Sequence, residues 1–309
     1  MFVVEYHLPK KFVWNPTFGQ HDHQPLGGAV FDDVLKSSLP DGYSLSRRTF
    51  YQFAADSSPR KSILVVTQHL DLVKADVSAL LDLARRGNKI LIASSSFSPL
   101  LADTLGFNNS YAYFNPRRLK EYAADLLERD SVFWIGDSAV YDKRTFRFYP
   151  HLCGIYFTKY DSLSLPLATS RIDSMQMFND CLPDCFPPVA ISRPFGGGEI
   201  VLVTTPLLFT NYGMLDGDNA AYLFRLLSHL KGLPVIRTEA YGAGAQIEES
   251  PFRYFLSQRP LKWALYLTMS VLVLFMVFTA RRRQRAIPVI REPANRNLEF
   301  TELIGIPVS

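Results

Sequence analysis

The sequence predicts an α/β protein with an open, mostly parallel sheet, followed by one membrane-spanning helix. Two short β-branched runs, SILVVTQH (62–69) and KILIASSS (89–96), read as strands that are buried on both faces. Near the C-terminus, residues 263–280 carry no charge and are followed by four arginines within five positions. The runs predict the sheet, and the uncharged stretch predicts the membrane helix.

The segment between the two runs predicts a helix. Val77, Leu80, Leu81 and Ala84 recur at helical spacing, and Gly87 follows as a C-terminal cap. A strand, a helix and a second strand in this order form a right-handed βαβ unit with parallel strands.

Both ends of the α/β domain, expected to cover residues 11–250, continue this pattern. Residues 11–14 read as a first strand, and Gly27 with Gly28 opens a helix near 32–37. Residues 188–209 give two strands joined at the glycines 196–198, where a hairpin turn is favoured over a phosphate-binding loop because a strand, not a helix, follows. Asp218 is placed to cap a later helix.

An aromatic-rich insertion is expected at about residues 108–185. We expect a helix near 117–129, followed by β-hairpins with short alternating runs. Its aromatic side chains, with basic neighbours such as Arg147, indicate either a recognition surface or, more often, a small core of the insertion's own.

The predicted membrane helix covers residues 261–280, about 30 Å as an α-helix, which matches a bilayer core. Five arginines follow it within a short distance, and three basic residues precede it, which favours a cytoplasmic tail at 281–309 and an extracytoplasmic body. Export of the body needs an N-terminal signal, so either the body is cytoplasmic or residues 1–10 are the remnant of a first membrane helix, and the second interpretation is favoured. The arginines expected at the membrane interface are Arg281, Arg282, Arg283 and Arg285.

Charge and cysteine content exclude several classes of protein. Of the formal charge of +4, the six arginines and three glutamates after residue 280 account for +3, so the body is nearly neutral and no nucleic-acid partner is expected. The three cysteines, Cys153, Cys181 and Cys185, are too few for a disulfide scaffold. Buried thiols or a single bridge are the two alternatives, and no cofactor is expected.

Several segments resemble the bacterial domain-of-unknown-function 4350 family. They are HDHQPLGGAVFDDVL, SILVVTQHLDLVKADVSALLDLARRGNKILIAS, GGGEIVLVTTPLLFTNYGMLDGDNAAYLFRLLSHL and the membrane segment ending in RRRQRAIPVIREPANRNLEF. The resemblance implies a doubly wound domain of the glutamine amidotransferase or flavodoxin-like type, placed between membrane helices in the cytoplasmic membrane. It also implies envelope or membrane proteins as partners, among them a MoxR-type AAA+ ATPase.

The best candidate site is the rim beyond the carboxyl ends of the strands, because ligands of doubly wound sheets bind there. The side chains expected on this rim are His21, His23, His69, Ser94, Ser95, Ser96, Thr205 and Asn211. His21 and His23 flank Asp22, a pattern that fits either a metal site or an exposed polar loop.

No catalytic residue is assigned. A glutamine amidotransferase needs a cysteine on a strained turn after a core strand, whereas IASSSFSP offers serines and no flanking glycine. We therefore expect a membrane-anchored, non-catalytic domain that binds a partner or small ligand in an envelope complex. A hydrolase or amidase that uses the histidine and serine rim, and a ligand sensor that signals through the tail, are the alternatives.

Overall fold

The computed structural model describes residues 14–56, 59–111, 130–137, 139–148, 154–171, 186–242, 259–282, 300 and 303–305. The expected N-terminal membrane helix, most of the strand at 11–14, the helix near 117–129, the three cysteines and the arginines 283 and 285 lie outside these residues. The chain divides into two compact units, Met1–Glu248 and Glu249–Ser309.

The first unit is built on a nine-stranded mixed sheet with the order β1-β11-β2-β3-β10-β9-β8-β5-β6. Five neighbouring strands are parallel: β1 (Tyr43–Ser46), β11 (Val235–Thr238), β2 (Ser62–Leu70), β3 (Lys89–Phe97) and β10 (Gly198–Val203). The antiparallel part contains β9 (Pro188–Phe195), β8 (Leu165–Ser170), β5 (Asp130–Trp134) and β6 (Thr145–Phe148). A separate two-stranded sheet pairs β4 (Asn108–Tyr111) with β7 (Ile155–Lys159).

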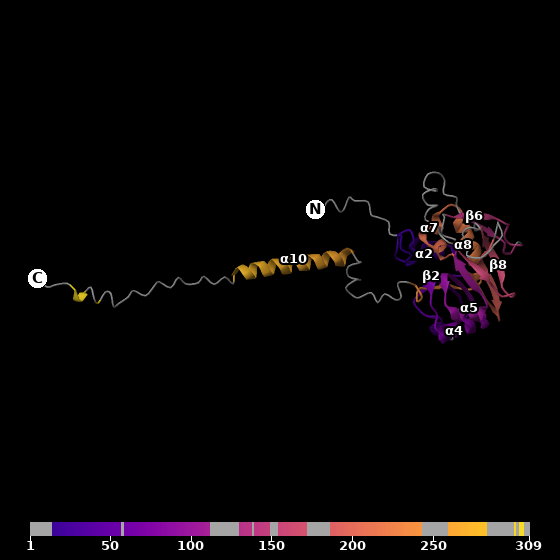
Figure 1. Ribbon diagram of the computed structural model, residues 1–309, viewed down its shortest axis with the longest axis horizontal. Helices are drawn as coiled ribbons and strands as arrows, with labels where there is room; N and C mark the ends of the chain where they lie inside the picture. The colour runs from indigo at the N-terminus through magenta and orange to yellow at the C-terminus, as the bar shows by residue number, and fades with distance from the viewer. Residues whose placement is uncertain are drawn as a thin grey trace. The chain divides into compact units, whose positions relative to one another are not determined.

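Helices cover both faces of the parallel strands (Figure 1). On β2, Leu64 and Val66 face one core, and Ile63 and Val65 face the other, which is why the whole run is apolar. The first face is covered by α2 (Ala29–Ser38), the short 3₁₀ helix η2 (Pro206–Phe209), α7 (Asn211–Leu215), α8 (Asn219–Leu227) and η3 (Ser228–Leu230). The second face is covered by α3 (Phe50–Ala54), α4 (Lys74–Arg85) and α5 (Pro99–Leu105).

The glycines at 196–198 form the predicted hairpin turn between β9 and β10. Gly196 has a φ of +61°, and a Cβ there would lie 2.7 Å from the Cα of Arg85. Only glycine fits this left-handed turn against α4. Asp218 does precede α8, but its carboxylate pairs with Arg144 and makes no side-chain cap.

The insertion extends the main sheet. Strands β5, β6 and β8 join the sheet beside β9, and the buried aromatic side chains of β5 and β6 enter the core on the first face. Trp134, Phe146 and Phe148 pack around Tyr222 of α8. We expected the insertion to have a small core of its own. Its described residues instead extend the core of the main sheet, because each strand that continues a sheet also continues its core.

One buried ion pair joins the last strand of the sheet to the first helix. Arg237 of β11 and Asp32 of α2 are each 1% exposed, and Nη1 lies 2.5 Å from Oδ2. The other Asp32 oxygen accepts the hydroxyl of Tyr43, and Nη2 of Arg237 donates to the carbonyl of Phe18. Burial raises the pKa of Tyr43, and the Asp32 carboxylate raises it further against the opposing effect of Arg237, so the hydroxyl remains a donor.

A second polar cluster lies at the opposite, amino end of the parallel strands. Glu199 Oε1 of β10 lies 2.7 Å from Nδ1 of His229 and 2.5 Å from Oγ of Ser192. Burial opposes ionisation of Glu199, but the hydrogen bonds from His229 and Ser192 outweigh it and hold its pKa below the ordinary value of 4.5. The ionised carboxylate thus ties η3 to β9 and β10.

The second unit contains α10 (Arg259–Arg282), in which residues Pro260–Thr279 are long and apolar enough to cross a membrane. None of this span is buried within the protein. The predicted membrane helix is thus present as an exposed apolar helix that could span a bilayer.

Removal of Asp32 should destabilise the domain strongly, because Arg237 would be left as an uncompensated buried charge. We expect Asp32→Ala to lower the free energy of unfolding by about 3–5 kcal/mol. Its neighbour Asp33 supplies a matched control, since the Asp33–Lys36 pair is exposed and Asp33→Ala should cost about 0.5 kcal/mol or less. Urea unfolding of the full chain in detergent, followed by tryptophan fluorescence, measures both, and equal losses would contradict this account.

Acid should remove the contribution of Glu199. Its folded pKa is below its ordinary value, so its stabilisation is complete above about pH 4.5 and is lost as the pH falls through the folded pKa. We expect Glu199→Gln to flatten the dependence of unfolding free energy on pH below that value, whereas Asp33→Asn should leave the slope of the parent protein. An unchanged slope in Glu199→Gln would refute the assignment.

Candidate functional site

The carboxyl ends of β3 and β10 form a topological switch point. These strands are neighbours in the sheet, but β3 leads into α5 on one face and β10 leads into η2 and α7 on the other. The two connections diverge to opposite faces of the sheet at this edge, and open α/β sheets bind ligands at such points. We call this end of the parallel strands the carboxyl edge.

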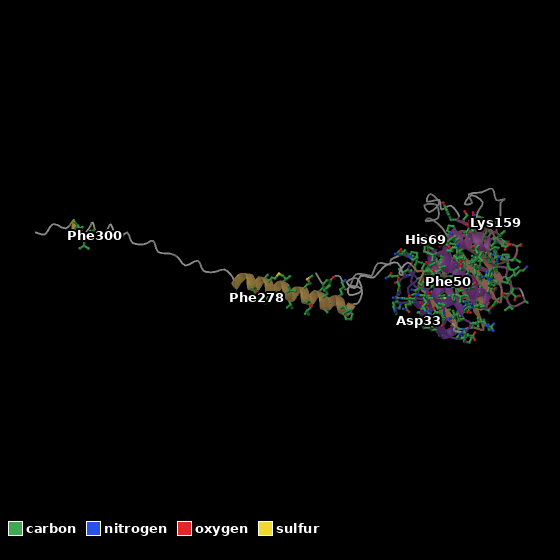
Figure 2. The ribbon with its side chains drawn as sticks, turned by 90° about the horizontal axis from the view of Figure 1, so that it is seen from below. Asp33, Phe50, His69, Lys159, Phe278 and Phe300 are labelled. Carbon is green, nitrogen blue, oxygen red and sulfur yellow. The ribbon has the colours of Figure 1, made fainter. Side chains whose placement is uncertain are left out.

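His69 and Ser96 lie next to each other on the carboxyl edge. They are paired in the register of β2 and β3, so both side chains project from the same face of the sheet. Both are exposed, and Figure 2 shows His69 at the surface of the domain. Within the part of the chain that the structure describes, neither side chain has a hydrogen-bond partner, so both are available to a ligand.

The two preceding serines are less available. Ser94 is buried, and its hydroxyl donates to the carbonyl of Ser96 over 2.7 Å. The carbonyl of Ser95 accepts the amide of Asn109. Ser94 therefore shapes the end of β3, and Ser96 is the serine that faces outward.

Asn211 holds the loop that contains the two histidines. Its amide nitrogen donates to the carbonyls of Asp22 (2.9 Å) and Gln24 (2.7 Å), and its amide oxygen accepts the backbone N–H of Val30 (2.7 Å). The structure thus brings Asn211 to a loop that is far from it in the sequence, but the side-chain amide is already engaged in these three hydrogen bonds. Asn211 is a structural clamp that closes the start of α2.

His21 and His23 are exposed on this loop. Asp22 between them is engaged within the chain, since its carboxylate accepts the hydroxyl of Thr17 and the backbone N–H of Gln24. Among the described residues, no group of three or more histidine, cysteine, aspartate or glutamate side chains is arranged to hold a metal ion. The arrangement around Asp22 is that of a polar loop with internal hydrogen bonds.

Three polar atoms at the carboxyl edge are buried without a partner among the described residues: Oε1 of Gln68, Oγ of Ser98 and Oγ1 of Thr205. They belong to the ends of β2, β3 and β10, which are adjacent strands. A buried polar atom without a partner costs free energy, so each of these three atoms needs an explanation. Thr205 was expected from the sequence; Gln68 and Ser98 were missed, although Gln68 lies beside His69 and Ser98 lies two residues after Ser96.

Tyr241 and Asp76 close the second face of this edge. The ring of Tyr241 stacks on Phe50, its hydroxyl accepts the N–H of Phe50 (2.6 Å), and Asp76 accepts the N–H of Tyr51. Burial raises the pKa of Tyr241, and Asp76 adds to the shift. The phenol remains protonated and serves as packing and as a hydrogen-bonding group, not as a base.

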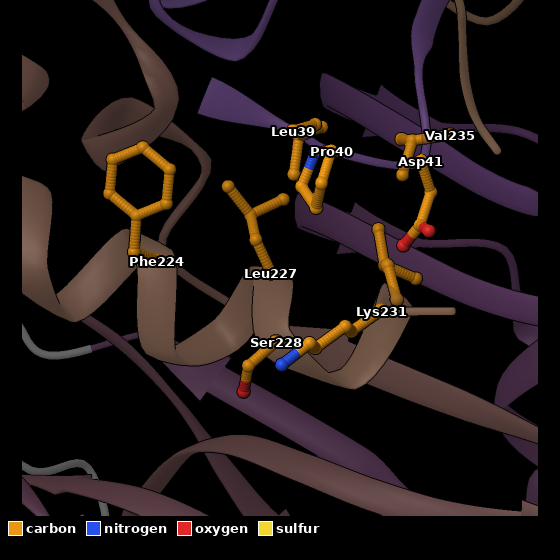
Figure 3. Close-up of a pocket in the computed structure, with 9 residues that line it drawn as sticks. Leu39, Pro40, Asp41, Phe224, Leu227, Ser228, Lys231 and Val235 are labelled. Atoms are coloured by element: carbon orange, nitrogen blue, oxygen red, sulfur yellow. The ribbon is translucent and has the colours of Figure 1, made fainter. Parts of the chain in front are cut away.

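A small pocket lies at the other end of the sheet. It has a cavity volume of about 110 Å³ and is mostly apolar (Figure 3). It lies where α2 ends, between α8, η3 and the start of β11, and is lined by Leu39, Pro40, Asp41, Phe224, Leu227, Ser228, Leu230, Lys231 and Val235. None of the rim residues contributes to it, so the cavity and the carboxyl edge are separate features.

Comparison with solved structures finds distant likenesses. A β-galactosidase from Rahnella sp. R3 is 12% identical with a TM-score of 0.35, over 57% of this chain and 23% of that one. An α-L-fucosidase isoenzyme 2 from Paenibacillus thiaminolyticus is 14% identical with a TM-score of 0.34, over 55% and 25%. The mmIFT52 N-terminal domain is 12% identical with a TM-score of 0.40, over 60% and 82%. The chain spans about a quarter of the length of the two glycosidases, and at these scores none of the likenesses assigns an activity.

Comparison with curated proteins gives no match. A family model, described as a domain of unknown function (DUF4350), matches residues 20–227. The match begins in the loop of His21 and His23, includes the whole carboxyl edge up to Asn211 and ends in α8. The resemblance found in the sequence is thus confirmed over two thirds of the chain, and this protein belongs to the DUF4350 family.

Proposed function

We propose that this protein is a membrane-anchored, non-catalytic α/β domain that binds a partner or small ligand at its carboxyl edge, as part of an envelope complex. The observation that carries the proposal is that the ends of β2, β3 and β10 hold three buried polar atoms without a partner among the described residues, those of Gln68, Ser98 and Thr205, at the same edge of the sheet as the exposed His69 and Ser96. A ligand with hydrogen-bonding groups would satisfy atoms that the described chain leaves unpaired. Such neutral donors and acceptors suit a polar group better than a strongly charged one.

Support for the anchor comes from α10. The apolar span of this helix is not buried in the protein. A helix of this length and composition therefore needs an apolar environment outside the protein, and a bilayer supplies one. In this proposal Arg281, Arg282, Arg283 and Arg285 lie at the cytoplasmic face of the inner membrane, and the body is extracytoplasmic.

The finer fold assignment and the partners belong to the same proposal. Helices on both faces of parallel strands support a doubly wound domain of the glutamine amidotransferase or flavodoxin-like type. Other envelope proteins, and a MoxR-type AAA+ ATPase on the cytoplasmic side, are the partners that the family resemblance implies.

A hydrolase or amidase is the second candidate function, and the register of His69 beside Ser96 is the observation that favours it. A serine nucleophile needs an adjacent base. However, no hydrogen bond joins these two described side chains, and the Oγ of Ser96 is not set on a strained strand-to-helix turn, since the strand continues to Phe97. The sensor alternative depends on the tail after residue 282, almost all of which lies outside the described residues, and stays a prediction.

The topology can be tested by cysteine accessibility in intact cells. With Cys153, Cys181 and Cys185 replaced, Ser110→Cys and Ser309→Cys would be treated with a membrane-impermeant thiol reagent after permeabilisation of the outer membrane. We expect labelling at 110 and protection at 309 until the inner membrane is opened. The reverse pattern would put the body in the cytoplasm and contradict the proposed localisation.

The rim can be tested with a photo-crosslinking amino acid at Ser96, and with Lys231 at the amino end of the strands as the matched exposed control. We expect adducts in cells at position 96 and few at 231, because the unpaired polar atoms lie at the carboxyl edge. Equal yields would contradict binding there. If a serine-directed fluorophosphonate probe labelled the purified full chain, and His69→Ala or Ser96→Ala abolished the labelling, the hydrolase would replace the binding function.

A further inference from the structure

The exposed apolar side chains of the parallel part of the domain gather at the carboxyl edge. Four of them follow the carboxyl ends of β1, β2, β3 and β10, and the fifth is Trp14, the first described residue. Their exposed fractions are 62% for Tyr51, 65% for Val73, 48% for Leu100, 69% for Leu215 and 61% for Trp14. We call these five residues the apolar ring. Single exposed apolar residues are ordinary, but in the parallel part they lie at one edge, which indicates a contact surface there. The rest of the domain exposes other large apolar side chains, namely Tyr111, Ile135, Val140, Tyr160, Leu163, Leu165 and Phe186.

The amino edge of the same strands has the opposite character. Its turns at 39–42, 59–61, 86–88, 196–198 and 231–234, all described, present no exposed large apolar side chain. Charged residues are exposed there instead, namely Asp41, Arg60, Arg86 and Lys231. Both edges consist of loops and turns that join the same strands. The presence of loops alone therefore does not explain why one edge exposes large apolar side chains and the other exposes charged ones.

Both points at which the chain leaves the described domain lie at the carboxyl edge. The ring of Trp14 contacts Tyr212 at the start of α7, with 5.9 Å between centroids. At the other end, the carbonyl of Tyr241 accepts the hydroxyl of Thr67 near the end of β2. Beyond Gly242 the chain continues to α10. The described part of the domain therefore ends at the edge that bears the apolar ring, before the candidate membrane span in the sequence.

Two basic side chains at this edge suit a lipid surface. Arg47 and Lys74 are exposed near Tyr51 and Val73, and in the described part of the chain no ion pair engages either one. Asp71 is also exposed, in the same loop as Val73. Tryptophan and tyrosine rings favour the headgroup region of bilayers, and basic side chains are attracted to anionic headgroups. The aromatic, apolar and basic side chains at this edge together match the headgroup region better than they match a surface that faces water.

We propose that the carboxyl edge is the membrane-facing surface of the domain, and that the apolar ring with Arg47 and Lys74 contacts the headgroup layer of the bilayer that α10 spans. The inference rests on the proposed membrane anchor and deepens the proposed binding function. His69 and Ser96 lie on the same edge. A ligand of the rim would therefore bind next to the lipid surface.

The test uses the full chain with the native cysteines replaced and one environment-sensitive fluorophore per variant. Val73→Cys and Leu100→Cys report on the apolar ring, Arg60→Cys and Lys231→Cys on the amino edge, and Leu272→Cys on α10. Each variant is reconstituted into vesicles of phosphatidylcholine and phosphatidylglycerol with a spin-labelled quencher lipid. We expect severalfold stronger quenching at 73 and 100 than at 60 and 231, and reduction of the difference by Arg47→Glu with Lys74→Glu.

The outcomes separate the inference from the function on which it rests. Quenching at 272 with equal, weak quenching at 73, 100, 60 and 231 would overturn the membrane-facing edge and leave the anchor intact. Absence of quenching at 272 would overturn the anchor and the inference with it. Shielding of positions 73 and 100 only in native membranes, and not in pure lipid, would overturn the lipid contact in favour of a protein partner.

Discussion

The domain depends on the contact between Arg237 and Asp32. This ion pair is almost completely buried, and it joins β11, the strand that lies between β1 and β2 in the sheet, to α2, the first helix among the described residues. Arg237 also holds the carbonyl of Phe18, a residue with a φ of +52°, so the pair fixes the loop that carries His21 and His23. A buried charge pair is a costly way to gain stability, but it permits one arrangement of helix and strand and disfavours others.

The same chain of contacts leads to the candidate site. The loop fixed by Arg237 is clamped a second time by Asn211, whose helix α7 follows β10 across the switch point. The carboxyl edge is therefore organised from both ends of the domain, while the side chains of its outward residues, His69 and Ser96, make no hydrogen bond or ion pair within the described chain. Rigid support beneath unengaged polar groups is the arrangement expected of a binding surface.

Much of this architecture could be predicted from local sequence. The runs around β2 and β3, the helix α4 between them, the glycine hairpin between β9 and β10 and the apolar helix at the C-terminus each follow from a pattern that a few neighbouring residues contain. Strand β11 was not predicted, because four residues with a central arginine look like a loop until Asp32 is placed opposite Arg237. The aromatic insertion was assigned a core of its own, since its sequence does not reveal that β5, β6 and β8 would lie beside β9.

The sequence by itself determined the class of the domain, its family and the presence of an apolar helix, because hydrophobic period and length are local properties. It also predicted the two strands that carry His69 and the serines 94–96. Only the tertiary structure decided which of them face outward: Asn211 and Ser94 are used within the chain, Ser96 and His69 are not, and Gln68 and Ser98 join Thr205 as buried atoms in need of a partner. That distinction depends on contacts between residues far apart in the chain, and no local pattern carries them.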